Sequence, residues 1–291
     1  MELADLLNKN QGQITTFSDA IDMCGTGGDK SNTFNISTLA SIVVSSYGAK
    51  VIKHSGRSTT SITGSVDILN EFGTDLDTSE DIKEICFKKF GLMFVSSQLL
   101  RETFGKAKQI CKKLNTPGFV NLIGPLTNPY KTNFHLLGVS SIEWGKLIVN
   151  TLQLLGKNEA LVVCSNANNI CLDELSFCGK NYIWRLSNEK ITEETFNPSD
   201  LGKKIINLNN LIVKDINESK LVFENLLKGA LKNDPKEDIV ALNAGAALYL
   251  TKKVKSIRDG YDFALRHIQS GKAWEHFQDF MNCNKKGLGE V

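Results

Sequence analysis

The sequence lacks the features that would assign it to several specialised classes of protein. Lys and Arg total 34 against 32 Asp and Glu, a formal net charge of only +2, so no broad basic surface for nucleic acid or anionic lipid is expected. No apolar run approaches the roughly 20 residues of a membrane-spanning helix. The opening MELADLLNKNQGQ also has no long apolar stretch of the kind found in signal peptides. We therefore expect a cytoplasmic protein with no nucleic-acid or membrane partner.

The spacing of cysteine and the scarcity of proline exclude further classes. The seven cysteines are odd in number and no two follow a CxxC spacing, which argues against a disulfide framework or a zinc module and favours a reducing compartment. We interpret these thiols as small buried hydrophobic side chains. The chain has only 5 Pro and no repeat or low-complexity tract, so no Pro-rich linker divides it.

Strand-like and helix-like segments alternate through the first two-thirds of the 291 residues. Strands are expected at 20–25, 49–55, 92–96, 134–140 and 159–165, and helices at 35–47, 66–72, 79–90, 104–115 and 142–155. A short hairpin is expected at 181–197, followed by helices at 219–232, 236–252, 256–270 and 272–282. This order predicts an α/β fold with a mostly parallel sheet flanked by helices and a helical C-terminal region. Residues 1–19 look like the end of a preceding helical segment.

The strongest local signal is the loop GTGGD at 25–29, between an expected strand and an expected helix. Glycines let backbone N–H groups approach an anion, and the start of the next helix adds positive dipole. Polar side chains in the first turn of that helix would join the site: Asn35, Ser37 and Thr38. Asp29 would repel a phosphate, so either this is a simple glycine turn with a capping Asp, or a cation bridges the two.

A second polar loop follows the next expected strand, from Lys53 to Ser61, and continues to Ser65. The carboxyl ends of adjacent parallel strands share one crevice, so this loop is expected to face the first. Lys53 and Arg57 offer charge to a phosphate, and hydroxyls come from Ser58, Thr60, Ser61 and Ser65. His54 has two interpretations, a structural histidine or a hydrogen-bonding group on the acceptor side.

The adjacent carboxylates Asp173 and Glu174 follow the strand expected at 159–165. Such a pair is often a solvated turn, but beside an anion site it suits Mg²⁺, which binds through one or two carboxylates together with substrate phosphates. With Ser37 as a further ligand, the metal would explain Asp29, because the ligand would arrive as a magnesium diphosphate. We find no nucleophile elbow and no Walker A lysine. His267 and His276 are interpreted as surface or packing residues.

Four motifs together resemble the anthranilate phosphoribosyltransferase family, over nearly the whole chain from about Asp22: GTGGDKSNTFNIST (25–38), KHSGRSTTSITGSVDILNEFG (53–73), NLIGPLTNP (121–129) and LDELS (172–176). The resemblance implies a large α/β domain, here 20–291, with a small helical domain, reduced here to a remnant at 1–19. This fold is shared with type III nucleoside phosphorylases. It also implies transfer of the ribosyl group of phosphoribosyl pyrophosphate to the amine of anthranilate, with release of diphosphate, in tryptophan biosynthesis.

Carried over by position, the resemblance implies a set of site residues. Lys53 and Asp29 would act in catalysis, and Ser37, Asp173 and Glu174 would hold Mg²⁺. The donor would contact Gly25, Gly28, Asp29, Thr33, Asn35, Ser37, Thr38, Lys53, Arg57, Ser58, Ser61 and Ser65. The acceptor side would be formed by Gly25, His54, Gly56, Cys111 and Pro125.

The acceptor side departs from the family pattern. Gly56 replaces an Asn, Cys111 stands where the family has an Arg for the anthranilate carboxylate, and Pro117-Gly118 replaces an Arg-Thr pair. Losing that Arg should weaken anthranilate binding severely. The family also has more helices before GTGGD, used for dimerisation. Only 24 residues precede Gly25 here, so we expect either that the chain is truncated or that it assembles differently, and a homodimer stays possible.

Three alternatives therefore stay open beside the anthranilate enzyme. The first is the same transferase with a different aromatic amine. The second is an enzyme like pyrimidine nucleoside phosphorylase, because the segment from Lys53 to Arg57 resembles the phosphate loop of that family. The third is an inactive binding protein on this scaffold.

Overall fold

The computed structural model describes residues 16–56, 63–96, 119–168 and 170–286. Its strands are β1 (Thr16–Gly25), β2 (Lys50–Ser55), β3 (Leu92–Ser96), β4 (Lys131–Gly138), β5 (Glu159–Ala167), β6 (Ile170–Leu172), β7 (Lys180–Ser187) and β8 (Lys190–Phe196). Its α-helices are α2 (Ile36–Ser46), α3 (Ser65–Glu71), α4 (Glu80–Phe90), α6 (Phe119–Ile123), α7 (Ile142–Leu154), α8 (Ile216–Leu227), α9 (Pro235–Leu250), α10 (Ile257–Gln269) and α11 (Lys272–Lys286). Short 3₁₀ turns are η2 (Gly124–Leu126), η3 (Pro198–Leu201) and η4 (Leu208–Leu211).

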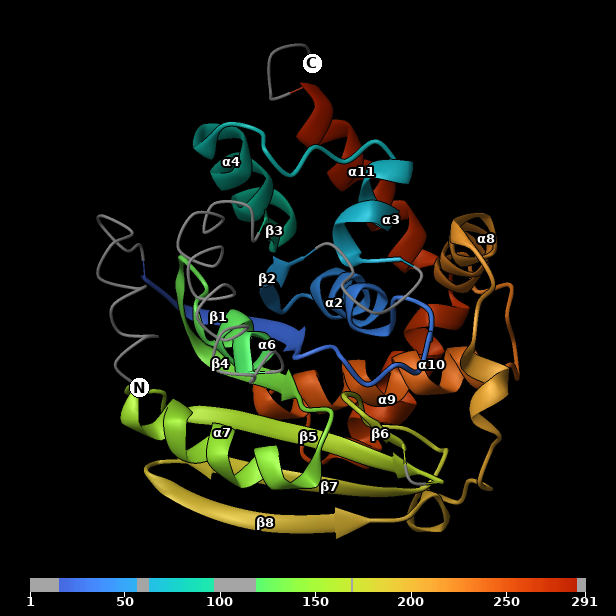
Figure 1. The fold of residues 1–291 in the computed structure, drawn as a ribbon. Helices are drawn as coiled ribbons and strands as arrows, with labels where there is room; N and C mark the ends of the chain where they lie inside the picture. The colour runs from blue at the N-terminus through green and yellow to red at the C-terminus, as the bar shows by residue number, and fades with distance from the viewer. Residues whose placement is uncertain (1–15, 57–62, 97–118, 169, 287–291) are drawn as a thin grey trace.

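One sheet runs through the molecule in the order β3-β2-β1-β4-β5-β7-β8, with β6 added on β5. The five strands from β3 to β5 are parallel, and β6, β7 and β8 pair antiparallel. The expected fold class, an α/β fold with a mostly parallel sheet, is confirmed (Figure 1).

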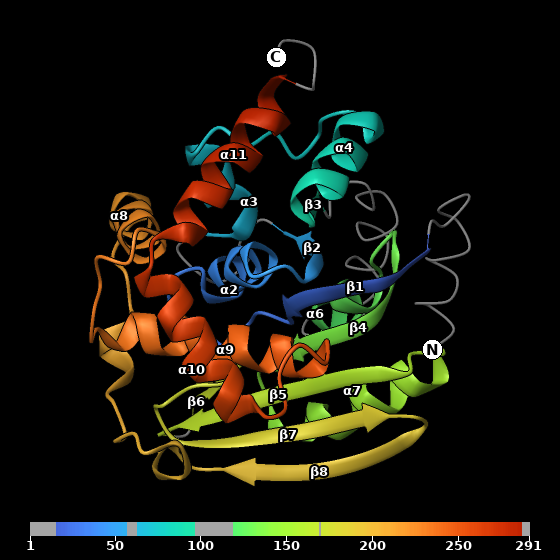
Figure 2. The ribbon, with the colours of Figure 1, turned by 180° about the vertical axis from the view of Figure 1, so that it is seen from behind.

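Helices cover both faces of the sheet, because β5 is apolar on both sides. Leu161 and Val163 pack into a core shared with α2, α9, α10 and α11, whereas Ala160 and Val162 pack against α7 on the opposite face. Figure 2 shows α9, α10 and α11 together on the side away from α7. A strand that is buried on both faces reads as a continuous apolar run, as EALVVCS does.

The strand order reverses between β1 and β4. From β1 the chain first builds outward through β2 and β3, and then returns to place β4 and β5 on the other side of β1. In open α/β sheets, ligands bind in the crevice outside the carboxyl ends of the strands at such a switch point. Here these ends are Gly25 of β1 and Gly138 of β4, which lie opposite one another in the sheet register.

Several element boundaries differ from the expectations. β1 begins at Thr16, so residues 16–19, which we assigned to a preceding helical segment, belong to the sheet and pair with β4 around Lys131. Residues 1–15 and the helix expected at 104–115 lie outside the described residues. The four C-terminal helices are confirmed to within a few residues at each end. Among the residues that the structure describes, no helix is both long and apolar enough to cross a membrane.

Candidate active site

The crevice between β1 and β4 is occupied by the turn that carries Asp173. A Cβ atom built on Gly25 would lie 2.2 Å from the Asp173 Oδ2, and one on Gly138 would lie 1.5 Å from the Asp173 backbone oxygen. Glycine is therefore required at both strand ends, because any side chain would displace this turn. The structure thus brings the LDELS motif against GTGGD, as the sequence motifs predicted.

The conformation of the GTGGD loop is fixed by the positive φ angles of its glycines and by hydrogen bonds to neighbouring segments. Gly27 and Gly28 adopt φ of +64° and +82°, which favours glycine. The Gly27 N–H donates to Asp173 Oδ2 at 2.7 Å, and the Thr26 N–H donates to the Gly138 carbonyl at 2.9 Å. This loop is therefore fixed to both the acidic turn and the end of β4.

Three carboxylates meet at this loop: Asp29, Asp173 and Glu174. Burial and the nearby Asp29 raise the pKa of Asp173 to about 7, against the opposing effect of the Gly27 N–H. Burial and Asp173 raise the pKa of Glu174 well above its ordinary value, although Lys53 and the Ser37 N–H stabilise its charged form. Like charges this close favour protonation or a bound cation.

The donor set suits Mg²⁺, which prefers carboxylate and hydroxyl oxygens. The Ser37 N–H hydrogen-bonds Glu174, which places the first turn of α2 beside the acidic pair. Asn35 at the N-cap makes no side-chain capping bond. The three carboxylates and the start of α2 therefore form one oxygen-rich cluster whose charged form a bound cation would stabilise.

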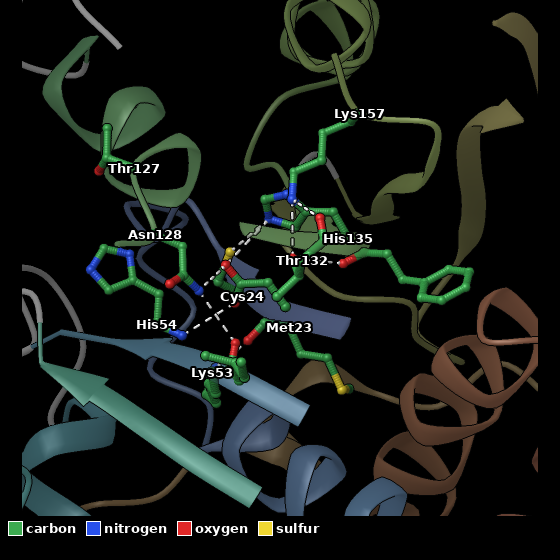
Figure 3. Close-up of polar contacts among 12 residues, drawn as sticks. Met23, Cys24, Lys53, His54, Thr127, Asn128, Thr132, His135 and Lys157 are labelled. Atoms are coloured by element: carbon green, nitrogen blue, oxygen red, sulfur yellow. Dashed lines mark hydrogen bonds and ion pairs between the residues drawn. The ribbon is translucent and has the colours of Figure 1, made fainter. Parts of the chain in front are cut away.

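Lys53 is buried next to this cluster of carboxylates rather than exposed to solvent. Its Nζ donates to the Met23 carbonyl at 2.6 Å, and Figure 3 shows Lys53 and Met23 close together. The Nζ also donates to the Ser37 Oγ at 3.0 Å. The side chain is buried, and burial lowers the pKa of the Lys53 ammonium. Lys53 therefore links the ends of β1 and β2 to the first turn of α2.

The second polar loop is described only at its ends. The Gly56 N–H donates to the Ser65 Oγ at 3.2 Å, so the two sides of the loop close on one another at the start of α3. Arg57, Ser58, Ser61 and Cys111 lie outside the described residues, and their placement stays a prediction.

Other predicted residues already have partners within the protein. Asn35 donates to the Thr63 carbonyl and accepts from the Ser219 hydroxyl at 2.9 Å, which ties α2 to α8. Thr33 forms an isolated bridge with Ile212, and Thr38 is buried. The side chain of Asn35 and the backbone of Thr33 therefore help to hold the start of α2 in place, and Thr38 packs in the interior. Pro125 is buried in η2.

A buried polar network beneath the site was not anticipated from the sequence. Asp22 of β1 is fully buried and accepts from the His54 N–H at 3.2 Å and from the Asn128 Nδ2 at 2.8 Å. His135 contacts Cys24 at 3.3 Å, and burial lowers the pKa of His135 to about 4. Figure 3 shows Asn128 and His135 converging on the end of β1. An Asp inside the apolar strand AIDMCG was the available signal, because a buried carboxylate needs donors.

His54 makes structural contacts within the protein, and its role on the acceptor side stays a prediction. Its backbone N–H serves the Asp22 network, and its ring accounts for a hydrogen bond to the Gly124 backbone. The Nε2 atom is buried and has no hydrogen-bond partner among the described residues. His267 and His276 hydrogen-bond Ser46 and Ser45 of α2, which fits the packing role expected for them.

Comparisons with known proteins agree with this architecture. The model of the glycosyl transferase family, a/b domain, matches residues 18–274. The chain is 37% identical over 263 residues to the anthranilate phosphoribosyltransferase of Staphylococcus haemolyticus, covering 90% of this chain and 76% of that protein. It is 34% identical over 276 residues to the enzyme of the same name from Dictyoglomus turgidum, covering 94% and 81%.

Solved structures give the same result. The anthranilate phosphoribosyltransferase of Thermus thermophilus superposes with a TM-score of 0.86 at 28% identity, covering 98% of this chain and 84% of that one. The enzyme from Saccharomyces cerevisiae in complex with PRPP and Mg superposes with a TM-score of 0.81 at 26% identity, covering 97% and 78%. The chain belongs to the anthranilate phosphoribosyltransferase family within the glycosyl transferase family.

Proposed function

We propose that this protein transfers the phosphoribosyl group of phosphoribosyl pyrophosphate to the amine of anthranilate, in a magnesium-dependent reaction that releases diphosphate. The observation that carries the proposal is the meeting of the GTGGD loop with Asp173 and Glu174 at the switch point of the sheet. A glycine loop offers N–H groups to phosphate oxygens, and a carboxylate cluster beside it is unfavourable unless a cation is shared.

Each part of the site has a role in this reaction. Ser37, Asp173 and Glu174 would hold Mg²⁺, which supplies positive charge for the departing diphosphate. The N–H groups of the GTGGD loop contact the phosphates, and Asp29 orients the loop by accepting from the Ser31 N–H at 3.1 Å. Lys53 adds positive charge below the pocket and fixes the Ser37 hydroxyl. As the bond at the ribose C1 breaks, these groups stabilise the charge that develops on the leaving group.

The acceptor needs little help from the protein. The amine of anthranilate is neutral at pH 7 and can attack without a strong base, which fits the lack of a general base among the described residues beside the carboxylates. The departures at Gly56 and Cys111 favour weak anthranilate binding, and they leave a different aromatic amine as the second candidate acceptor. A phosphorolytic reaction is less well supported, because bare phosphate gains nothing from three converging carboxylates.

Fluorescence of anthranilate tests the proposal. We expect its signal to fall when purified protein is mixed with phosphoribosyl pyrophosphate, Mg²⁺ and anthranilate, and to stay constant without the metal. Glu194→Gln, an exposed carboxylate on β8, is the matched control and should keep the wild-type rate. No decay at high enzyme concentration would reject anthranilate. Calorimetry with magnesium phosphoribosyl pyrophosphate alone then distinguishes an altered acceptor, which still binds the donor, from an inactive homologue.

A further inference from the structure

The strongest unassigned feature outside the active site is a pair of thiols between α4 and α11. The Sγ atoms of Cys86 and Cys283 lie 3.1 Å apart, although the residues are 197 positions apart in the sequence. Both side chains are buried, with exposed fractions of 1% and 7%. Because this separation is shorter than an ordinary contact between two sulfur atoms, a small movement brings them to bonding distance.

The surrounding contacts hold α11 against the segments that precede and follow α4. One residue along α11, Asn284 makes two hydrogen bonds with the backbone of Asp75: the Asp75 N–H donates to its Oδ1 at 2.7 Å, and its Nδ2 donates to the Asp75 carbonyl at 3.0 Å. On the other side, Phe280 packs edge-on against Phe94 of β3. The thiols therefore meet because the backbone on both sides is fixed. Figures 1 and 2 both show α4 and α11 side by side.

A small cavity borders Cys86, one member of this pair. Its lining includes the side chains of Cys86, Lys83, Phe280 and Asn284. The Oγ1 atom of Thr74, which also lines it, is buried without a hydrogen-bond partner among the described residues. The cavity therefore leaves room for about one small polar molecule beside Cys86, and a peroxide would have to reach the sulfur through it.

We propose that Cys86 and Cys283 form a disulfide when the protein meets a peroxide, and that this bond fastens α11 to α4. In the first step a thiolate attacks one peroxide oxygen and the O–O bond breaks. This gives a sulfenic acid, and the other oxygen leaves as water with the thiol proton. The second sulfur then attacks the sulfenic sulfur, and the second oxygen leaves as water with the second proton. Two thiols are oxidised and one peroxide is reduced.

The reaction is slow rather than immediate. Burial and the neighbouring thiol raise the pKa of Cys86 to about 12, which keeps the thiolate scarce at neutral pH. The product stabilises the fold, because a bridge across 197 positions restricts the unfolded chain strongly.

Peptide mapping of the wild-type protein tests the proposal directly. The protein is treated with hydrogen peroxide, blocked with N-ethylmaleimide and digested without reductant. We expect a linked Cys86–Cys283 peptide, the loss of two free thiols per chain, and reversal by dithiothreitol. The melting temperature should rise by about 5 °C or more on oxidation. Recovery of both residues as singly blocked or over-oxidised peptides would overturn the proposal.

A second thiol pair provides the matched control. Cys171 of β6 hydrogen-bonds Cys164 of the neighbouring strand β5, only seven positions earlier in the sequence. Cys171→Ser should therefore keep both the linked Cys86–Cys283 peptide and the rise in melting temperature, whereas Cys283→Ser should lose both. If the rise survives in Cys283→Ser, or disappears in Cys171→Ser, the bridge between α4 and α11 is not its source.

Discussion

Two acidic centres lie near the carboxyl end of β1, and they are built in opposite ways. Asp22 accepts hydrogen bonds from two donors that the fold supplies, the His54 N–H and the Asn128 amide. Asp173 instead faces Asp29 and Glu174, and the Gly27 N–H donates to it. The first carboxylate is satisfied by the fold, whereas the second group remains short of positive charge. We infer that the first holds the strands together and the second awaits a ligand.

The largest expected effect is a loss of enzyme activity when the Asp173 centre is changed. Asp173→Asn should lower the rate of anthranilate consumption by about 10³-fold, because it removes a metal ligand and the charge that balances it. Its melting temperature without magnesium should equal or exceed that of the wild type, since a repulsion is also removed. Initial rates at saturating Mg²⁺ and a thermal scan measure both. A rate close to that of the wild type would show that Asp173 does not hold the metal.

A substitution of Asp22 should lower the stability of the fold rather than act directly on the reaction. Asp22→Ala leaves the His54 N–H without an acceptor and the Asn128 amide with only its longer hydrogen bond to the Ile52 carbonyl, and we expect a loss of about 3 kcal/mol in the free energy of unfolding. Asp22→Asn should lose less, because an amide oxygen still accepts from one of the two donors. Urea denaturation measures both, with Asp173→Asn as the comparison. Equal losses for Asp22→Ala and Asp173→Asn would remove the distinction between the centres.

Lys53 links the two centres, and its replacement should have a smaller effect. Lys53→Met removes the hydrogen bond to the Ser37 Oγ and the positive charge near Glu174. We expect the affinity for magnesium phosphoribosyl pyrophosphate to fall about tenfold, which is the typical size of one charge-assisted contact. Calorimetry measures it. Affinity for the aromatic acceptor should stay unchanged, and an equal loss for both ligands would argue against a donor-side role.

The fold and the donor side could be predicted from the sequence because their signals are local. Gly25, the GTGGD loop and the Asp173-Glu174 pair each stand next to a strand, and parallel strands bring their carboxyl ends to one edge. The earlier starts of α8 and β1 could not be placed, because terminal residues are chosen by pairing partners rather than by their own propensity.

The Asp22 network needed the structure, because its partners are distant in sequence. Asn128 lies 106 positions from Asp22, and nothing local in NLIGPLTNP identifies its acceptor. The same holds for the contact between Cys86 and Cys283. Lys53 was predicted to serve the donor, but its contact with the Met23 carbonyl depends on how β2 lies against β1. Long-range pairing of polar groups is therefore the part that strand and helix patterns do not specify.

The smallest expected effect is a pH dependence confined to the unsatisfied centre. The pKa of Asp173 is raised to about 7 in the folded chain, so the folded state binds a proton that the unfolded state releases at a lower pH. The metal-free protein should therefore lose stability as the pH rises from about 4 to about 7, with no further loss from this group above that range. Mg²⁺ competes with the same proton, so its affinity should weaken by up to about tenfold for each pH unit below 7.

Thermal scans with and without Mg²⁺ between pH 5 and 8 should diverge by a few degrees as the pH increases. In Asp173→Asn the divergence should shrink, because its titrating group is gone. Parallel curves for the wild type would mean that hydrogen bonds within the fold already satisfy the carboxylates at the GTGGD loop, as they do for Asp22.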